Sequence, residues 1–148
     1  MGQMSPKQFF SQPTAPEHTA ALEATDAALT AAGINTFNGF PFAVISIAGI
    51  IAQCQDQTAA YYVWPEEGSV VKGKWVFSKP VDLNDDDDWA TKPLLVDASS
   101  ANAFRIINEA VNDSNKAKLH KAILDSRGMC VWAFEKMIWP FVGFVKRG

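Results

Sequence analysis

The segment TAAYYVWPEEGSVVKGKWVF, residues 58–77, decides the fold that the sequence predicts. Its two ends, residues 58–64 and 70–77, are rich in aromatic and β-branched residues, which favour strands. Between them stands Pro-Glu-Glu-Gly, residues 65–68. Proline presets φ for a turn and glycine accepts a positive φ, so this tetrapeptide favours a tight reversal of the chain. We therefore expect a central antiparallel β-hairpin.

Before the hairpin, the pattern predicts one clear helix and one ambiguous segment. Thr-Ala-Pro-Glu at residues 14–17 has the form of a capping box with proline in the first turn. A helix capped by Thr14 is therefore expected up to residue 32, with Gly33 as its stop. In residues 42–53 the residue types favour a strand, whereas the length favours a helix. We expect a buried helix there, and a strand remains the alternative.

After the hairpin, the pattern predicts a strand and two capped helices. Residues 94–96, Leu-Leu-Val, form the expected strand. The first helix is expected to end near residue 111, and the second to run to residue 125, where Arg127-Gly128 ends it. The expected N-caps are Asp97 or Ser99 for the first helix and Asp113 or Ser114 for the second.

The tail, residues 129–145, is rich in large apolar side chains. Proline disfavours the helical conformation of the residue before it, so Trp139-Pro140 is expected to break any helix in this tail. We expect a helix up to Ile138 and a strand over residues 141–145.

These elements predict an α+β fold. A small antiparallel sheet, made of the central hairpin and one or two further strands, is expected to pack against three or four helices. The chain has 148 residues, a length at which about two-thirds of the surface can be buried on folding. Residues 14–148 are expected to form one domain, preceded by an extended N-terminal arm over residues 1–13.

Composition limits the class of protein and its compartment. The apolar fraction of 48% excludes a wholly disordered chain, and the net charge of -3 argues against nucleic acid as the partner. Cys54 and Cys130 are expected to be buried, reduced thiols. The N-terminus has no apolar signal-peptide stretch, and the longest apolar run, residues 40–52, is shorter than the roughly 20 residues of a membrane span. A cytoplasmic protein, or one assembled into a particle, is expected.

Two motifs resemble ligand-binding sequences, and each departs from its pattern at important positions. Residues 68–74 match the phosphate-loop spacing GxxxxGK, but Trp75 stands where a serine or threonine should bind magnesium. Four residues of the acidic segment alternate as in a calcium-binding loop. The glycine position of that motif holds Asp87, and its final position holds Pro93. A weak cation site remains open, with Asp82, Asn84, Asp86 and Asp88 as candidate ligands, and no cofactor is expected.

Catalytic candidates are few. His18 and His120 are the only histidines, and their polar flanks indicate surface positions. An enzyme would have to use His120 with Asp125, with Cys130, or with the acidic segment. Nucleic-acid binding would need a basic cluster and exposed aromatic side chains. The sequence offers such a cluster at Lys116, Lys118, Lys121 and Arg127 and aromatic residues in the hairpin, but the same aromatic residues fit a sheet core.

Aromatic residues are the most unusual feature, since the chain holds five Trp and ten Phe. A core filled by rings is one explanation. The alternative is that several rings face a partner, because aromatic side chains are favoured anchors of protein interfaces. The candidate interface residues are Phe9, Phe10, Phe40, Phe42, Trp139, Phe141 and Phe144.

The absence of a catalytic motif and the abundance of aromatic residues favour a non-enzymatic structural or assembly subunit. Its partners would be protein subunits, either copies of itself or components of a larger complex such as a virus or phage particle, tail or injection apparatus. A small ligand-binding or regulatory domain, with a pocket between hairpin and helices, is the first alternative. An enzyme with an unfamiliar site is the second.

Overall fold

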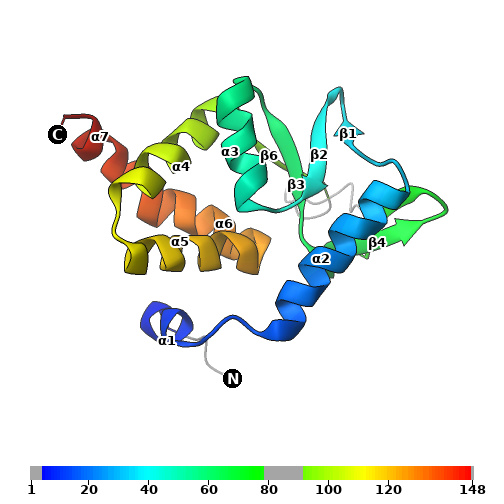
Figure 1. Ribbon diagram of the computed structural model, residues 1–148, viewed down its shortest axis with the longest axis horizontal. Helices are drawn as coiled ribbons and strands as arrows, with labels where there is room; N and C mark the ends of the chain where they lie inside the picture. The colour runs from blue at the N-terminus through cyan, green and yellow to red at the C-terminus, as the bar shows by residue number, and fades with distance from the viewer. Residues whose placement is uncertain (1–4, 79–91, 148) are drawn as a thin grey trace, which may run out of the picture.

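Residues 5–78 and 92–147 are described by the computed structural model, which has the predicted α+β class. Its middle layer is a four-stranded sheet with the strand order β1-β2-β3-β6. Helices α3 to α7 lie on one side of this sheet, and α2 and the β4–β5 hairpin lie on the other (Figure 1). The strands of this sheet are β1 (Thr36–Phe37), β2 (Phe40–Val44), β3 (Ala60–Val63) and β6 (Leu94–Val96).

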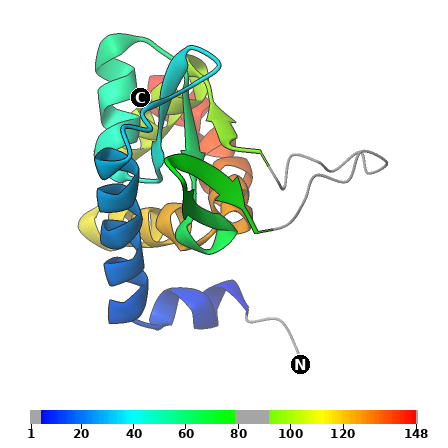
Figure 2. The same cartoon turned by 90° about the vertical axis from the view of Figure 1, so that its right-hand side faces the viewer.

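The hairpin forms one strand later than the sequence predicted. It joins β4 (Gly68–Val71) to β5 (Lys74–Phe77) through Lys72 and Gly73, which both have positive φ. Two positive φ values define the turn that best matches the twist of a hairpin. Figure 2 shows this hairpin in front of the sheet. The Pro-Glu-Glu-Gly segment forms instead a single 3-10 turn, η1 (Pro65–Glu67).

Strand β3 lies inside the mixed sheet and does not pair with the hairpin. It pairs in parallel with β2 and antiparallel with β6, so the prediction of a purely antiparallel sheet was wrong. Both of its faces carry buried residues, among them Tyr62 on one and Val63 on the other. A strand covered on both faces satisfies its backbone groups best with a neighbour on each side.

Residues 42–53 contain both of the elements between which the sequence left a choice. Strand β2 ends at Val44, and helix α3 (Ile47–Asp56) begins after Ser46, whose hydroxyl accepts a hydrogen bond from the amide of Gly49 at 2.9 Å. The expected single helix was therefore wrong for residues 42–46, which precede α3. The order β2-α3-β3 supplies the crossover helix that a parallel strand pair needs.

A buried glutamine ties α3 to the sheet. Gln53 is only 3% exposed. Its side-chain amide donates to the carbonyls of Val96 at 2.8 Å and Thr58 at 3.1 Å, and its carbonyl accepts from the Tyr62 hydroxyl at 2.6 Å. Because a buried polar group is costly when it has no partner, this network fixes the position of α3 over β3 and β6.

The N-terminal segment is not the predicted extended arm. Residues Pro6–Ser11 form helix α1, which is started by a capping box between Ser5 and Gln8. Helix α2 (Pro16–Ala31) begins with proline in its first turn as predicted. Its N-cap, however, is Ala15 without a side-chain bond, so the prediction that Thr14 caps it was wrong. Gly33 has a φ of 72° and ends this helix as expected.

Helices α4 (Ala98–Ala110), α5 (Asp113–Asp125) and α6 (Arg127–Ala133) follow β6. Asp97 caps α4 by accepting from the amide of Ser100 at 2.7 Å, which confirms one of the two predicted caps. The cap of α5 is Asn112, one residue before the predicted pair. Ser126 ends α5 and caps α6, so Arg127-Gly128 begins a helix where an end was predicted.

The C-terminal tail is helical throughout, and the predicted strand over residues 141–145 was wrong. A π turn, η3 (Phe134–Ile138), leads into α7 (Trp139–Arg147). The amide of Trp139 bonds to the carbonyl of Phe134, five residues back. Pro140 follows this π turn within a helical stretch that runs without a break from Arg127 to Arg147, so the predicted break at Trp139-Pro140 was also wrong.

Each face of the sheet has its own hydrophobic core. The larger core, between the sheet and helices α3 to α7, contains Trp64, Phe104 and Ile123, and both cysteines. Cys54 and Cys130 are buried and not joined in a disulfide, as the sequence predicted. The smaller core lies under α2 and the hairpin and is built from Leu29, Phe42, Val44 and Val63.

Candidate functional site

An exposed apolar surface, which we call the sheet-edge patch, consists of Phe37, Phe40, Tyr61 and Leu95. Directly paired residues of neighbouring strands point to the same face of a sheet. The pairs Phe37–Phe40, Phe42–Tyr61 and Tyr61–Leu95 therefore place all of these side chains on one face. The ring centroids of Phe37 and Phe40 lie 4.9 Å and 6.3 Å from that of Tyr61.

Large parts of the sheet-edge patch are open to solvent. Phe37 is 36% exposed, Phe40 is 42% exposed and Leu95 is 50% exposed. Phe42 belongs to the same face and is only 5% exposed, because it packs in the smaller core with Leu29. Its ring is therefore covered by this chain's own residues. Of the patch members, the sequence singled out Phe40 as an interface residue; the strand register adds the others.

A second exposed aromatic surface lies on α7. Trp139 is 48% exposed and Phe141 is 51% exposed. Phe141 lines a cavity of about 390 Å³, which we call the C-terminal cavity, together with side chains of α4, α5 and η3. Phe144 also belongs to α7, and its side chain lies outside the described part of the structure.

Phe9 and Phe10 attach α1 to the rest of this chain. The two rings are in edge contact at 5.0 Å, and the Phe10 ring lies 5.9 Å from that of Trp132. The Lys121 ammonium lies 4.5 Å from the centre of the Phe9 ring and donates to the carbonyls of Phe9 and Gln12. Both aromatic side chains are thus half-buried against α5 and α6 of the same chain.

The two histidines line one cavity of about 540 Å³ between α2, α5 and the segment that joins α1 to α2. Nε2 of His18 lies 2.6 Å from the carbonyl of Leu124, and Nε2 of His120 lies 2.6 Å from Oδ1 of Asn108. Asp125, one of the predicted catalytic partners of His120, also lines this cavity. The two histidines are 102 positions apart, and nothing in the sequence indicated that they would line the same cavity.

Burial lowers the pKa of His120, and the nearby Lys116 ammonium lowers it further. The unfolded chain therefore binds a proton at this position more readily than the folded chain does. Stability from this group is complete above its ordinary pKa of about 6.5 and is lost as the pH falls below it.

We expect the free energy of unfolding to fall between pH 7.5 and pH 5, and to fall less in His120→Gln, whose amide can still donate to Asn108. Urea denaturation at a series of pH values measures both slopes. Equal slopes in the two proteins would show that His120 does not contribute.

Cys130 does not have the properties of a catalytic nucleophile. Burial raises the pKa of its thiol to about 12, although the Arg127 guanidinium acts against this shift. A thiol with so high a pKa is not ionised near neutral pH, and the thiolate is the reactive form. Burial also raises the pKa of Cys54, whose Sγ donates to the carbonyl of Ala101 at 3.0 Å.

The remaining sequence motifs do not form a site in the described structure. Residues 68–74 belong to the β4–β5 hairpin, and the rest of strand β5 follows them where the phosphate-binding motif needs a helix. Asp82, Asn84, Asp86 and Asp88 lie outside the described residues. Across residues 5–78 and 92–147, no three His, Cys, Asp or Glu side chains are grouped so that they could hold a metal ion.

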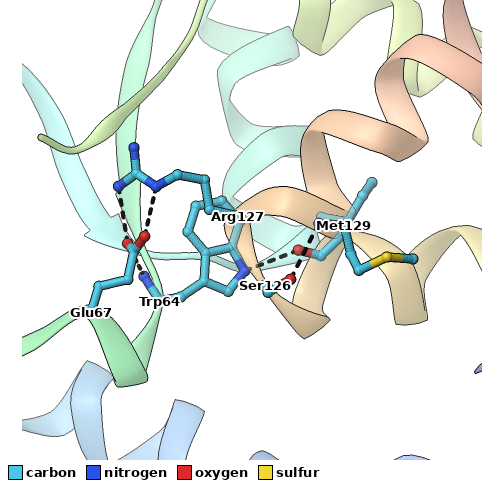
Figure 3. Close-up of polar contacts among 6 residues, drawn as sticks. Trp64, Glu67, Ser126, Arg127 and Met129 are labelled. Carbon is cyan, nitrogen blue, oxygen red and sulfur yellow. Dashed lines mark hydrogen bonds and ion pairs between the residues drawn. The ribbon is translucent and has the colours of Figure 1, made fainter. Parts of the chain in front are cut away.

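Two members of the predicted basic cluster are engaged inside the chain. Lys121 holds α1, and Arg127 forms a two-bond ion pair with Glu67 (Figure 3). The arginine donates from Nε to Oε2 at 2.6 Å and from a terminal nitrogen to Oε1 at 3.0 Å. Oε1 of Glu67 also accepts from the amide of Trp64 at 3.0 Å. The pair links η1 to the start of α6 and was not foreseen from the sequence.

No protein-family model matches this chain, and comparisons with curated proteins and with solved structures give no significant match. Within the described residues, none of the helices combines the length and the apolar character that crossing a lipid bilayer requires.

Proposed function

We propose that this protein is a non-enzymatic subunit of a larger protein assembly and that it binds neighbouring subunits through the sheet-edge patch. The observation that carries the proposal is the exposure of Phe37, Phe40 and Leu95 beside Tyr61 on one face. Monomeric proteins rarely expose large contiguous apolar patches, and such patches commonly mark interaction sites.

The composition of the patch supports a protein partner. Interfaces are enriched in aromatic residues at their centre and depleted of charged ones. The sheet-edge patch holds three rings and a leucine. A stable interface buries about 800 Å² on each partner, so the patch would form the centre of the contact, with polar neighbours as its rim.

The position of α7 supports an assembly of more than two chains. Figure 1 shows β1 and α7 toward opposite ends of the longest axis of the molecule. Trp139 and Phe141 therefore expose rings far from the sheet-edge patch. A subunit with two separated apolar surfaces can bind two neighbours at once, as components of a particle, tail or injection apparatus do.

Replacing both phenylalanines, Phe37→Ser with Phe40→Ser, is expected to weaken association at least tenfold, because two aromatic anchors leave the centre of the contact. Sedimentation velocity over a range of concentrations measures this change. The matched control is Val71→Ser with Val76→Ser, since both valines are almost half exposed on the hairpin and lie outside the patch. This control should associate as the unchanged protein does.

The unchanged protein must associate for the proposal to hold. If it stays monomeric over the whole concentration range, and also fails to bind protein partners from its source, the assembly function is wrong. Equal association of the patch variant and the valine control would show that another surface forms the contact.

A further inference from the structure

We propose that the C-terminal cavity binds a small carboxylic acid with an apolar body, such as a medium-chain aliphatic acid. This inference does not rest on the sheet-edge patch, and it shares only Phe141 with the surfaces proposed above for assembly. At about 390 Å³ the cavity falls within the size range of small-molecule sites. Three structural elements converge on it: the end of α4, the start of α5, and the η3–α7 segment.

The walls of the cavity are predominantly apolar. Helix α4 contributes Ile107 and its C-cap residue Val111, α5 contributes Leu119, and the η3–α7 segment contributes Met137 and Phe141. Half of the Phe141 surface is exposed although it borders an apolar cavity. A hydrocarbon chain or ring in the cavity would cover this surface, and the removal of apolar area from water favours binding.

Two polar side chains of the cavity indicate which chemical group the polar end of the ligand should carry. Lys136 and Asn115 line the same cavity, and no acidic side chain is among its lining residues. In the described part of the chain, Lys136 has no ion-pair partner. One ammonium and one amide can hold a carboxylate by a charge-assisted hydrogen bond and a neutral one. A phosphate with two charges is typically held by more donors than these.

The π turn η3 contributes two of the residues that line the cavity. Lys136 and Met137 belong to η3, where each hydrogen bond spans one residue more than in an α-helix. Phe141 lies four residues after Met137, a spacing that places both side chains on one face of the helix, and both line the cavity. Single π turns inside helices occur frequently at functional sites.

The test measures binding of the aliphatic acids from hexanoate to dodecanoate by NMR titration and calorimetry, below their micelle-forming concentrations. We expect saturable binding, with amide shifts in η3, α7 and the end of α4. Ala110→Trp, which places a large ring in the cavity from an exposed position, should weaken binding at least tenfold. The same substitution at exposed Ala52 on α3 is the control and should leave binding unchanged.

A second variant separates recognition of the carboxylate from filling of an apolar cavity. Lys136→Gln should weaken octanoate binding at least fivefold and leave octanol binding unchanged, whereas Lys118→Gln should change neither. Both lysines are charged side chains outside the core, so these variants test the proposal even if Ala110→Trp does not fold. The proposal is overturned if no acid in the series binds saturably. It is also overturned if neither Ala110→Trp nor Lys136→Gln weakens octanoate binding, or if Lys136→Gln weakens octanoate and octanol binding equally.

Discussion

Arg127→Met is expected to lower the free energy of unfolding by about 3–5 kcal/mol, because it leaves the Glu67 carboxylate buried without its counter-ion. The two side chains are only 7% and 12% exposed, and two hydrogen bonds join them. Methionine keeps much of the side-chain volume that lies over the Trp64 ring. The loss would therefore report the charge more than the packing. Urea denaturation followed by circular dichroism measures it.

A second substitution tests this explanation. In the double variant Arg127→Met with Glu67→Gln, the amide oxygen can still accept from the Trp64 amide and no charge is left unpaired, so we expect most of the lost stability to return. The matched control is Arg105→Met, which breaks the exposed pair between Arg105 and Glu109 and should cost less than about 1 kcal/mol. A similarly small cost for Arg127→Met would show that the buried pair contributes little to stability.

Trp64→Ala is expected to be comparably destabilising, by about 3–5 kcal/mol, because it opens a cavity in the larger core. Trp64 has no exposed surface and packs in the core cluster that contains Tyr62, Phe104 and Ile123. Its indole nitrogen donates to the carbonyl of Ile123 at 3.2 Å, so the side chain also joins the segment between β3 and η1 to α5.

Trp64→Phe separates the two contributions of this residue. Phenylalanine retains much of the apolar ring but leaves the Ile123 carbonyl without its donor, for an expected cost of about 1–3 kcal/mol. Trp139→Ala removes an indole that is half exposed, and serves as the control with an expected cost below about 1 kcal/mol. If Trp64→Ala costs no more than Trp139→Ala, the surrounding core must collapse onto the vacated space.

The parts of the fold that the sequence predicted correctly are those with a local cause. Asp97 caps α4 because its carboxylate accepts a hydrogen bond from the amide of Ser100, only three residues further along the chain. Gly33 ends α2 because glycine adopts a positive φ without a steric penalty. The short strand β6 was predicted from its residue types. Each of these features involves residues within one or two turns of each other.

Errors of local interpretation arose where two signals competed. The Pro-Glu-Glu-Gly segment and the pair Lys72-Gly73 both favour a turn, and the tighter two-residue turn made the hairpin. Ser46 caps α3, and serine is a favoured N-cap residue. Its position therefore indicates that a helix begins within residues 42–53 and that the residues before it belong to another element. In the tail, a π turn accommodates Pro140, an outcome that the strong helix-breaking tendency of proline argued against.

The candidate sites depended much more on contacts between distant segments. Phe40 and Phe42 are two residues apart and have the same chemistry, yet one is 42% exposed and the other 5% exposed. The difference comes from α2, which packs over Phe42 near Leu29. Likewise, the C-terminal cavity joins residues 107 to 141, and no spacing within the sequence indicates that they meet.

Residue types and short-range hydrogen bonds were thus sufficient to specify an α+β chain, most of its helices and its buried thiols. Packing across the whole chain decided three further features. These are the strands that pair with β3, the position of both histidines at one cavity, and which aromatic rings are exposed to solvent. Hydrophobic burial is non-directional, so many apolar segments can cover one another equally well in principle. Only the assembled shape, with its close-packed cores on both faces of the sheet, determines which segments do so.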